Sequence, residues 1–511
     1  MKNTQVVIPM AGKSQRFFDY GYTKPKSLIE FNGLPMIGHI LKIFKDFDDI
    51  LVIANTHDFN KYDLQNFVSK LHKGAKVINI DTHNLGPSFS ILKAKDQISI
   101  TKKIIVHYCD FSGTWNPIET INLLNTYDGV FVTFSGFHPS KINKTKFAYG
   151  KTDGTNRLLK IKEKGSFTSN PENELASSGI YGFASGEMLI GAISDQIASN
   201  LQINGEFYTS LTQEVMLNKN KNIVTQNMES FSAWGTPEDL ESFMYFTQSC
   251  SFINKVSSII NPVIDHTGII LAAGKSLRLK LNNEKPKQLK NIVNESNLLD
   301  YSKKLIIDKS NIFLVATSKV YPKNIWNLEK DNLAVLSHAT ESQLSSVQIG
   351  LSLLKNKNSP VTFLASDNLI HFEENFKISE KLSGCDILVW AAKDYPISTV
   401  QPDQYSWIKV NDENIIENVI YKKSPVDLRN WKIITGNFTF RTADLVYFLI
   451  DKFEDLYSKL QREPILDDLI GVALEVNMAV KVLDVPNFMT LGSEMENDTF
   501  DYYSKLINKT I

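Results

Sequence analysis

The sequence predicts an α/β protein made of two tandem domains, each a Rossmann-like, doubly wound mixed sheet. Three observations lead to this prediction: a length of 511 residues, a repeat of domain size, and apolar strand-like runs that alternate with helical stretches. A single hydrophobic core rarely grows beyond about 250–300 residues, so a chain of this length contains more than one domain. The repeat indicates that there are two.

The repeat is a series of landmarks that return in the same order. Ala11-Gly12 returns as Ala273-Gly274 after 262 positions, and Lys24-Pro25-Lys26 returns at Lys285 after 261. Further along, the offset is 257 or 258 for Asp110 and Asp367, Lys164 and Lys422, Gly179 and Gly436, Glu206 and Glu463, and Gly235 and Gly492. Such a nearly constant offset indicates a duplication. We expect an N-terminal domain over 1–247, a linker over 248–264 and a C-terminal domain over 265–511.

Within each half, short apolar runs have the length and composition of buried parallel strands. The first half contains TQVVIPMAG, DILVIAN, KVINID, KIIVHYCD and GVFVTFSG; the second contains GIILAAG, NIFLVATS, LAVLSHA, VTFLASD and DILVWAAK. Helical stretches lie between them, such as Pro35 to Phe47 and Asp300 to Lys309. Strands alternating with helices predict doubly wound sheets, which bind ligands beyond the carboxyl ends of their strands.

Composition excludes several classes of partner. The formal net charge is -1, so no overall field would attract nucleic acid or an anionic membrane. Three widely spaced cysteines form neither a disulfide framework nor a metal-binding pair. No run of about 18 apolar residues is present, so we expect no membrane insertion and a cytoplasmic location.

Two Gly-Lys-Ser triplets, at Gly12 and Gly274, suggest a phosphate-binding P-loop at first sight. A P-loop also needs a glycine five positions earlier, where this chain has Val7 and Ile269. A dinucleotide-binding GxGxxG motif is absent as well, because serines stand at its second glycine. A kinase or ATPase of the P-loop type is therefore excluded.

The pattern that is present is a strand, Ala-Gly, an arginine, and a loop ending in Lys-Pro-Lys. It occurs as AGKSQRFFDYGYTKPKSLIEFNGLPMIGH and again as AGKSLRLKLNNEKPKQLKNIVNESNLLDY. This duplicated pattern resembles the signature of the nucleotidylyltransferases that activate sugar phosphates and related phosphate esters. The resemblance implies attack by a phosphate oxygen on the α-phosphorus of a nucleoside triphosphate (NTP), with release of pyrophosphate.

Such a reaction brings two anions together, so its catalysis depends on positioning and on cations that stabilise the transferred group. The glycine turn, with Ala11 and Gly12 or Ala273 and Gly274, would present backbone amides to the triphosphate. Arg16 and Arg278 would grip the outer phosphates through their forked guanidinium groups. Lys26 and Lys287 would place a positive charge beside the α-phosphate.

Asp110 and Asp367 each follow a buried strand, and the resemblance implies that they hold Mg²⁺ against the phosphates. Magnesium in such sites commonly uses one or two carboxylates plus phosphate oxygens. Many family members carry a second aspartate just before a TPED segment, but FSAWGTPEDL has Gly235 and no carboxylate there. The metal would then depend on one aspartate and water, or borrow Glu229 or Asp239.

The acceptor side is implied by the segments LKIKEKG, LASSGIYGF and INGEFYTS. Lys164 would meet the acceptor phosphate, Ser178 and Gly179 would line the acceptor, and Glu206 would accept bonds from its hydroxyls. Their counterparts in the second half are Lys422, Gly436 and Glu463.

Two segments are candidates for base recognition. HNLGPSFSIL supplies Gly86 and Ser88, and ESQLSSVQIGLSLL supplies Ser345 and Ser346, whose hydroxyls could bond a pyrimidine. The second segment resembles cytidylyltransferases, which favours CTP or UTP.

The sequence thus predicts a Mg²⁺-dependent nucleotidyltransferase that uses an NTP and a small phosphorylated acceptor for surface-polysaccharide (capsule) precursor synthesis. Two alternatives stay open: two working sites, or one catalytic domain joined to a degenerate copy that binds nucleotide or serves as scaffold. The oligomeric state is not predicted.

Overall fold

The computed structural model describes residues 1, 3–142, 146–255, 261–275, 286–293, 296–321, 328, 332–457 and 462–510. The chain separates into two compact units, which we call unit 1 (Met1–Met244 with Asn508–Ile511) and unit 2 (Tyr245–Ile507). Helix α9 (Pro237–Lys255) runs across this division, so residues 248–255 of the segment expected as a linker are helical. No described helix combines the length and the apolar character that a membrane span requires.

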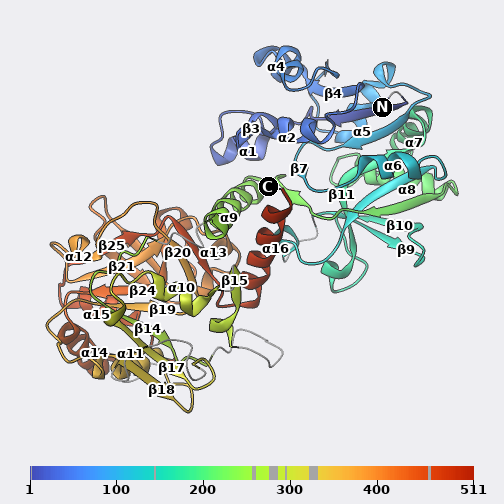
Figure 1. Cartoon of the computed structure of the whole chain (residues 1–511). Helices are drawn as coiled ribbons and strands as arrows, with labels where there is room; N and C mark the ends of the chain where they lie inside the picture. The colour runs from blue at the N-terminus through green and yellow to red at the C-terminus, as the bar shows by residue number, and fades with distance from the viewer. Residues whose placement is uncertain are drawn as a thin grey trace. The chain divides into compact units, whose positions relative to one another are not determined.

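Unit 1 contains a nine-stranded mixed sheet (Figure 1). Its strands are β1 (Thr4–Pro9), β4 (Ile50–Asn55), β5 (Ala75–Ile80), β6 (Lys103–His107), β8 (Gly129–Phe134), β9 (Ala148–Thr152), β10 (Leu158–Glu163), β11 (Leu175–Phe183) and β12 (Ile223–Asn227). Seven strands follow the order β10-β9-β11-β6-β1-β4-β5; β8 pairs with β11, and β12 pairs with β8. β1 runs parallel to β4 and β6, whereas β11 is antiparallel to β6.

Unit 2 repeats this sheet strand for strand. Its strands are β14 (Thr267–Ala272), β17 (Ile312–Thr317), β18 (Leu333–Leu336), β19 (Val361–Ala365), β21 (Ile387–Ala392), β22 (Trp407–Val410), β23 (Ile416–Ile420), β24 (Trp431–Phe440) and β25 (Val480–Asp484). The order β18-β17-β14-β19-β24, with β22 and β21 both paired to β24, is the order of unit 1 read from its other end. The two sheets confirm the predicted fold class.

Short strand pairs complete each unit. In unit 1, β2 (Glu30–Phe31) pairs with β3 (Leu34–Pro35), and β7 (Phe111–Ser112) pairs with β13 (Ser232–Ala233). In unit 2, β15 (Asn291–Val293) pairs with β16 (Ser296–Asn297), and β20 (Asn368–His371) pairs with β26 (Asn487–Thr490). The β7–β13 and β20–β26 pairs begin directly after Asp110 and Asp367, so each of them fixes the chain that leaves a predicted metal-binding residue.

Helices connect the strands in both units. Those of unit 1 are α1 (Gln15–Tyr20), α2 (Met36–Ile43), α3 (Thr56–Lys61), α4 (Leu64–Leu71), α5 (Pro87–Lys93), α6 (Pro117–Leu123), α7 (Gly186–Ala198) and α8 (Thr209–Asn218). Those of unit 2 are α10 (Leu298–Lys304), α11 (Gln343–Ser352), α12 (Ile378–Lys381), α13 (Pro396–Val400), α14 (Ala443–Tyr457), α15 (Asp468–Glu475) and α16 (Glu494–Thr510).

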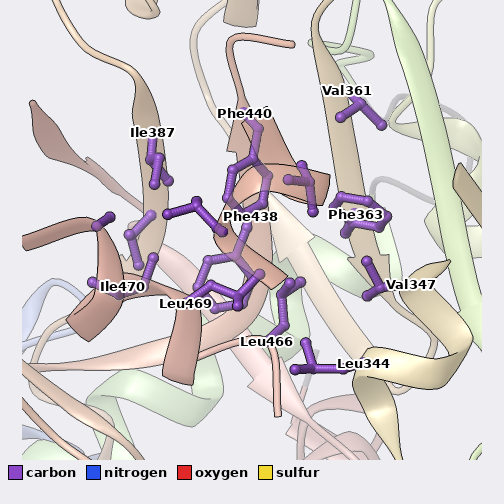
Figure 2. Packing of buried hydrophobic residues seen from close by; sticks show 14 of the residues in the cluster. Leu344, Val347, Val361, Phe363, Ile387, Phe438, Phe440, Leu466, Leu469 and Ile470 are labelled. Atoms are coloured by element: carbon purple, nitrogen blue, oxygen red, sulfur yellow. The ribbon is translucent and has the colours of Figure 1, made fainter. Parts of the chain in front are cut away.

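Each unit has a hydrophobic core between its sheet and three helices. In unit 1 the core joins β1, β4 and β6 to α5, α7 and α8 through residues such as Val7, Ile53, Val106, Ile91 and Ile193. In unit 2, Figure 2 shows the corresponding core, where Phe363 and Phe438 of the sheet lie with Val347 of α11 and Leu469 of α15. Because these faces are covered by helices, the strands are apolar along most of their length, as the sequence indicates.

Helix α7 begins where it touches the loop before β6, and the contact leaves no room for a side chain. A Cβ atom added at Gly186 would lie 2.1 Å from the carbonyl oxygen of Ser99. Five residues later on the same helix, a Cβ at Gly191 would meet no atom within 4 Å. The two glycines therefore differ in what they do for the fold, although both lie in one helix.

We predict that Gly186→Ala lowers the free energy of unfolding by about 1–3 kcal/mol, because the added methyl group displaces a backbone carbonyl. Gly191→Ala, the matched control, should raise it by about 0.5–1 kcal/mol, because alanine favours the helix. Urea unfolding followed by circular dichroism measures both. Equal effects of the two substitutions would contradict this packing of α7.

Lys141 is a buried lysine of unit 1, with 2% of its surface exposed. Its ammonium group donates to the carbonyl oxygens of Gly136 and Glu172, both at 3.4 Å, and lies 4.7 Å from the ring centre of Phe134. Burial lowers the pKa of Lys141 from 10.5 to about 8, although Glu172 and Glu174 oppose the shift.

Between pH 8 and 10.5 the folded chain has lost a proton at Lys141 that the unfolded chain still binds. The free energy of unfolding should therefore rise with pH in this window by on the order of 2 kcal/mol relative to a Lys141→Met variant. Unfolding measured at intervals from pH 7 to 10.5 gives this difference. The exposed Lys151→Met control should differ from the wild type by the same amount at every pH.

Candidate functional site

The parallel strands β1 and β6 bring two predicted site residues to one edge of the sheet of unit 1. Val7 of β1 pairs with Val106 of β6, so both strands end at the same edge. Gly12 follows β1 and Asp110 follows β6. After β1 the chain adds β4 and β5 on one side of that strand and then β6 on the other side, so the strand order reverses between β1 and β6. Ligands of doubly wound sheets bind at such a switch point.

A cavity of about 820 Å³ opens at this edge. It has the size and mixed lining of a small-molecule site. The predicted residues that line it are Ala11, Gly12, Arg16, Lys26, Gly86, Asp110, Lys164, Ser178, Gly179 and Glu206. The structure thus brings together residues from widely separated parts of unit 1.

Lys26 and Asp110 form an ion pair, with 2.7 Å between Lys26 Nζ and Asp110 Oδ2. The backbone N–H of Lys26 donates to Ser14 Oγ at 3.0 Å, which ties the Lys-Pro-Lys loop to the turn after β1. Burial alone would lower the pKa of Lys26, but Asp110 outweighs burial and raises it. The lysine is therefore positively charged at neutral pH.

The chain opposite Asp110 has two small residues, Ala233 and Gly235, on either side of Trp234. The N–H of Trp234 donates to the carbonyl oxygen of Asp110 at 2.8 Å, and Ala233 pairs with Phe111. A Cβ at Gly235 would lie 3.5 Å from Asp110 Oδ2, so the backbone passes close to the carboxylate. No group of three or more His, Cys, Asp or Glu side chains suited to a metal occurs in the described parts of the chain. Asp110 therefore fits Mg²⁺ only as one ligand among oxygens that come from elsewhere.

Of the two residues considered as substitute ligands, Asp239 lines the cavity and Glu229 does not. Asp239 already pairs with Lys146 at 3.1 Å and accepts bonds from Ser140 and Thr236. Its carboxylate thus stabilises the start of α9 and the wall that carries Lys146.

Lys164 lines the cavity in a left-handed backbone conformation, with φ of 50°. Its ammonium donates to the hydroxyl of Tyr208 and lies 4.5 Å from the centre of that ring. Tyr208 in turn donates to Glu206, and burial together with this bond raises the tyrosine pKa. Glu163, which also lines the cavity, accepts a bond from Ser210, and burial raises its pKa.

Gly179 has a φ of 93°, and a Cβ there would lie 2.8 Å from Cε1 of Phe111. Only glycine fits this position beside the residue that follows Asp110. The neighbouring Ser178 donates its hydroxyl to the carbonyl oxygen of Val132 at 3.0 Å, so its side chain fixes the strand rather than pointing freely into the cavity.

The two residues predicted for the base differ in position. Gly86 lines the cavity with φ of 86°, whereas Ser88 is fully buried and its hydroxyl lies 3.0 Å from Thr212 Oγ1. His83 and Asn84 line the cavity beside Gly86, although the sequence did not single them out. Burial, with Lys93 and Lys13, lowers the pKa of His83, so its ring is neutral at pH 7. Both ring nitrogens have partners within the chain: Nδ1 accepts from the N–H of Leu85 at 3.0 Å, and Nε2 lies 3.1 Å from Ser90 Oγ.

Other cavity residues that the sequence analysis missed are Tyr208, Glu163 and Lys146. Their signal was weak because Glu163 and Tyr208 stand close to better-known motif residues and Lys146 lies in a segment without a recognised motif. Glu163 directly precedes Lys164, and Tyr208 lies two residues after Glu206. Only the folded chain shows that Tyr208 connects Lys164 to Glu206.

Unit 2 has the same ion pair. Lys287 Nζ lies 2.5 Å from Asp367 Oδ2, and the N–H of Leu491 donates to the Asp367 carbonyl oxygen at 2.8 Å. A Cβ at Gly492 would lie 3.0 Å from Asp367 Oδ2. This is the arrangement of Asp110, Trp234 and Gly235 in unit 1.

The remaining residues predicted in unit 2 have varied surroundings. Lys422 and Gly436 have φ values of 46° and 80°, which match Lys164 and Gly179, and Lys422 Nζ donates to the Gln404 carbonyl oxygen at 2.9 Å. Ala273 is buried at the end of β14 and accepts a bond from the N–H of Thr340 at 3.1 Å. Gly274 is exposed, and so is Glu463. Arg278 lies outside the described residues.

The hydroxyls of Ser345 and Ser346 bond within their own segment. Ser345 Oγ lies 2.9 Å from Ser342 Oγ, and Ser342 caps the start of α11. Ser346 Oγ lies 2.7 Å from Thr340 Oγ1. Both serines therefore stabilise the loop before α11.

Comparison with known proteins identifies part of unit 1. Residues 6–114 match the family of MobA-like NTP transferase domains, and the match includes Gly12, Arg16, Lys26 and Asp110. This match over 6–114 supports the nucleotidyltransferase class that the sequence analysis expects. No curated protein sequence matches the chain.

Solved structures of similar fold are also known. The chain is similar to a nucleoside-diphosphate-sugar pyrophosphorylase of Vibrio cholerae RC9, with 22% identity and a TM-score of 0.41 over 47% of this chain and 99% of that one. It is also similar to the CTP:phosphocholine cytidylyltransferase of Streptococcus pneumoniae, with 13% identity and a TM-score of 0.36 over 47% of this chain and 98% of that one.

Proposed function

We propose that the chain transfers a nucleoside monophosphate from an NTP to the phosphate of a small phosphorylated acceptor. An acceptor phosphate oxygen attacks the α-phosphorus, a new P–O bond forms, and the bond to the bridging oxygen breaks. Pyrophosphate leaves with that electron pair. The observation that carries this proposal is the gathering of Arg16, Lys26 and Lys164 around one cavity with Asp110.

The cavity supports a distinct task for each cation. The Gly12 turn and Arg16 suit the β- and γ-phosphates, because the turn offers amides and arginine offers a fork of donors. Lys26, held beside Asp110, suits the α-phosphate, where charge develops. Lys164, at the end that carries Glu163 and Glu206, suits the acceptor phosphate. A Mg²⁺ ion bound with the triphosphate would neutralise its charge and use Asp110 as a protein ligand.

For the acceptor we propose a phosphorylated sugar or alditol, used to make surface-polysaccharide precursors in the cytoplasm. The carboxylates of Glu163 and Glu206 line the same end of the cavity as Lys164, and carboxylates accept hydrogen bonds from hydroxyl groups. For the nucleotide we propose CTP or UTP, on the resemblance of the second-half segment SSVQIGL to cytidylyltransferases.

We propose further that both units are active. The Lys287–Asp367 pair, the left-handed Lys422 and the positive φ of Gly436 support a second working site, because each repeats a feature of unit 1. The alternative is a unit 2 that binds nucleotide or serves as scaffold without turnover.

Pyrophosphate release, measured with each NTP and a panel of phosphate esters, tests the function. Asp110→Ala should lower the turnover of the substrates of unit 1 on the order of 10²–10³-fold, and Asp367→Ala should do the same for those of unit 2. Asp49→Ala, which removes a similar ion pair outside the cavity, should leave both rates unchanged. If Asp367→Ala spares every turnover that Asp110→Ala abolishes, unit 2 is not catalytic; if neither matters, the assignment of these aspartates is wrong.

Lys164→Ala should raise the KM of the acceptor by roughly 10–100-fold, because a bond between an ammonium and a phosphate contributes about 1.5–3 kcal/mol. The affinity for the NTP alone, measured by calorimetry, should change little. The control is Lys162→Ala on the preceding strand β10, since Lys162 bonds the carbonyl oxygen of Ser166 outside the cavity. An unchanged acceptor KM would contradict the role given to Lys164.

A further inference from the structure

In both units a lysine forms an ion pair with the aspartate that follows β6 or its counterpart β19. Lys26 Nζ lies 2.7 Å from Asp110, and Lys287 Nζ lies 2.5 Å from Asp367. The four side chains are between 12% and 26% exposed, so water screens these pairs only in part. The lysines come from 3₁₀ turns (Lys26–Leu28 and Lys287–Leu289) that are similarly placed in the two sequences.

Of the described residues, those opposite Asp110 in unit 1 are small: Ala233 and Gly235 line the cavity there. In unit 2 a Cβ at Gly492 would lie 3.0 Å from Asp367 Oδ2 and 3.4 Å from Glu496 Oε2, so a second carboxylate is near. The corresponding carboxylates of both units already have partners. Asp239 pairs with Lys146, and its counterpart Glu496 accepts bonds from Tyr405 and from the N–H of Ser493.

A divalent ion that approached alone would find one carboxylate already neutralised by an ammonium group. Magnesium takes about six oxygen ligands, and a site that offers one must draw the others from water or substrate. The ion would also lie close to the lysine charge, which opposes its binding. A nucleotide changes both conditions, because its phosphates supply oxygens and a negative charge for the lysine.

We infer that neither unit holds a divalent ion by itself: the lysine is the resident cation on each strand-end carboxylate, and the metal enters only together with nucleotide phosphates. The residues present do not fit a metal held by the protein alone. This inference rests on the proposed function for its nucleotide and concerns the order of assembly at the same site.

Equilibrium dialysis of the full chain against Mn²⁺, without acceptor, tests the inference. We expect little Mn²⁺ to be retained by the chain alone, and Mn²⁺ to be retained together with CTP or UTP when either nucleotide is added. Tight retention of Mn²⁺ by the nucleotide-free chain would overturn the inference. Failure to retain any nucleotide would instead count against the proposed function, and the nucleotide-free measurement would still decide the inference.

Removal of the lysine gives a second test. Lys26→Gln should increase the nucleotide-free affinity for Mn²⁺ roughly tenfold or more, since a contacting opposite charge shifts the proton affinity of a carboxylate by about one to three units. The increase should disappear in Lys26→Gln/Asp110→Asn. Lys102→Gln is the matched control, because the Lys102–Asp49 pair has a similar distance, 2.8 Å, and lies outside the cavity.

Lys287→Gln makes the same test in unit 2. It replaces the first variant if circular dichroism shows that Lys26→Gln does not fold. No gain of Mn²⁺ affinity in a folded lysine variant, or an equal gain in Lys102→Gln, would show that the lysine does not keep the ion out. The dialysis of the wild-type chain needs no variant at all.

Discussion

The parallel pairing of β1 with β6 is the constraint on which the site of unit 1 depends. It brings the glycine turn after β1 and the aspartate after β6 to one edge of the sheet, although about a hundred positions separate them in the sequence. Backbone hydrogen bonds fix this register, and a shift by one residue would turn every apolar side chain of the strand to the opposite face. Unit 2 uses the same pairing, between β14 and β19, to bring Gly274 and Asp367 to one edge.

The sequence predicted the fold class because two signals agreed: apolar runs of strand length and a duplication with a constant offset. It also predicted ten of the residues that line the cavity, since the turn, the lysine loop and the strand-end aspartate are local patterns with recognisable spacing. Contacts between distant segments could not be predicted in this way. The 2.7 Å between Lys26 and Asp110 and the bond from Tyr208 to Glu206 depend on packing that no local pattern records. Ser88 shows the converse, because its helix turns the hydroxyl into the core.

The surroundings of Lys164 and Lys422 show how the neighbours of a lysine can change while a buried carboxylate is kept nearby. Glu163 of unit 1 corresponds to Tyr421 of unit 2, and Ser210 corresponds to Asp467. Glu163 bonds Ser210, and Lys164 partly offsets the rise in its pKa that burial causes. Burial likewise raises the pKa of Asp467, and Lys422 partly offsets the rise. A buried carboxylate therefore interacts with this lysine in both units, but it comes from a different element in each, so a comparison of motifs alone would record a loss.

The left-handed backbone of Lys164 and Lys422 has a wider consequence. A side chain in this conformation costs roughly 1 kcal/mol that glycine would avoid, and asparagine would reduce. Both copies of the domain nevertheless carry lysine there. Glycine would give a more stable backbone at this position. What the two units share there is the ammonium group of a lysine. At both positions the backbone would be more stable with another residue, and the ammonium group that is present instead is what the role proposed for these lysines requires.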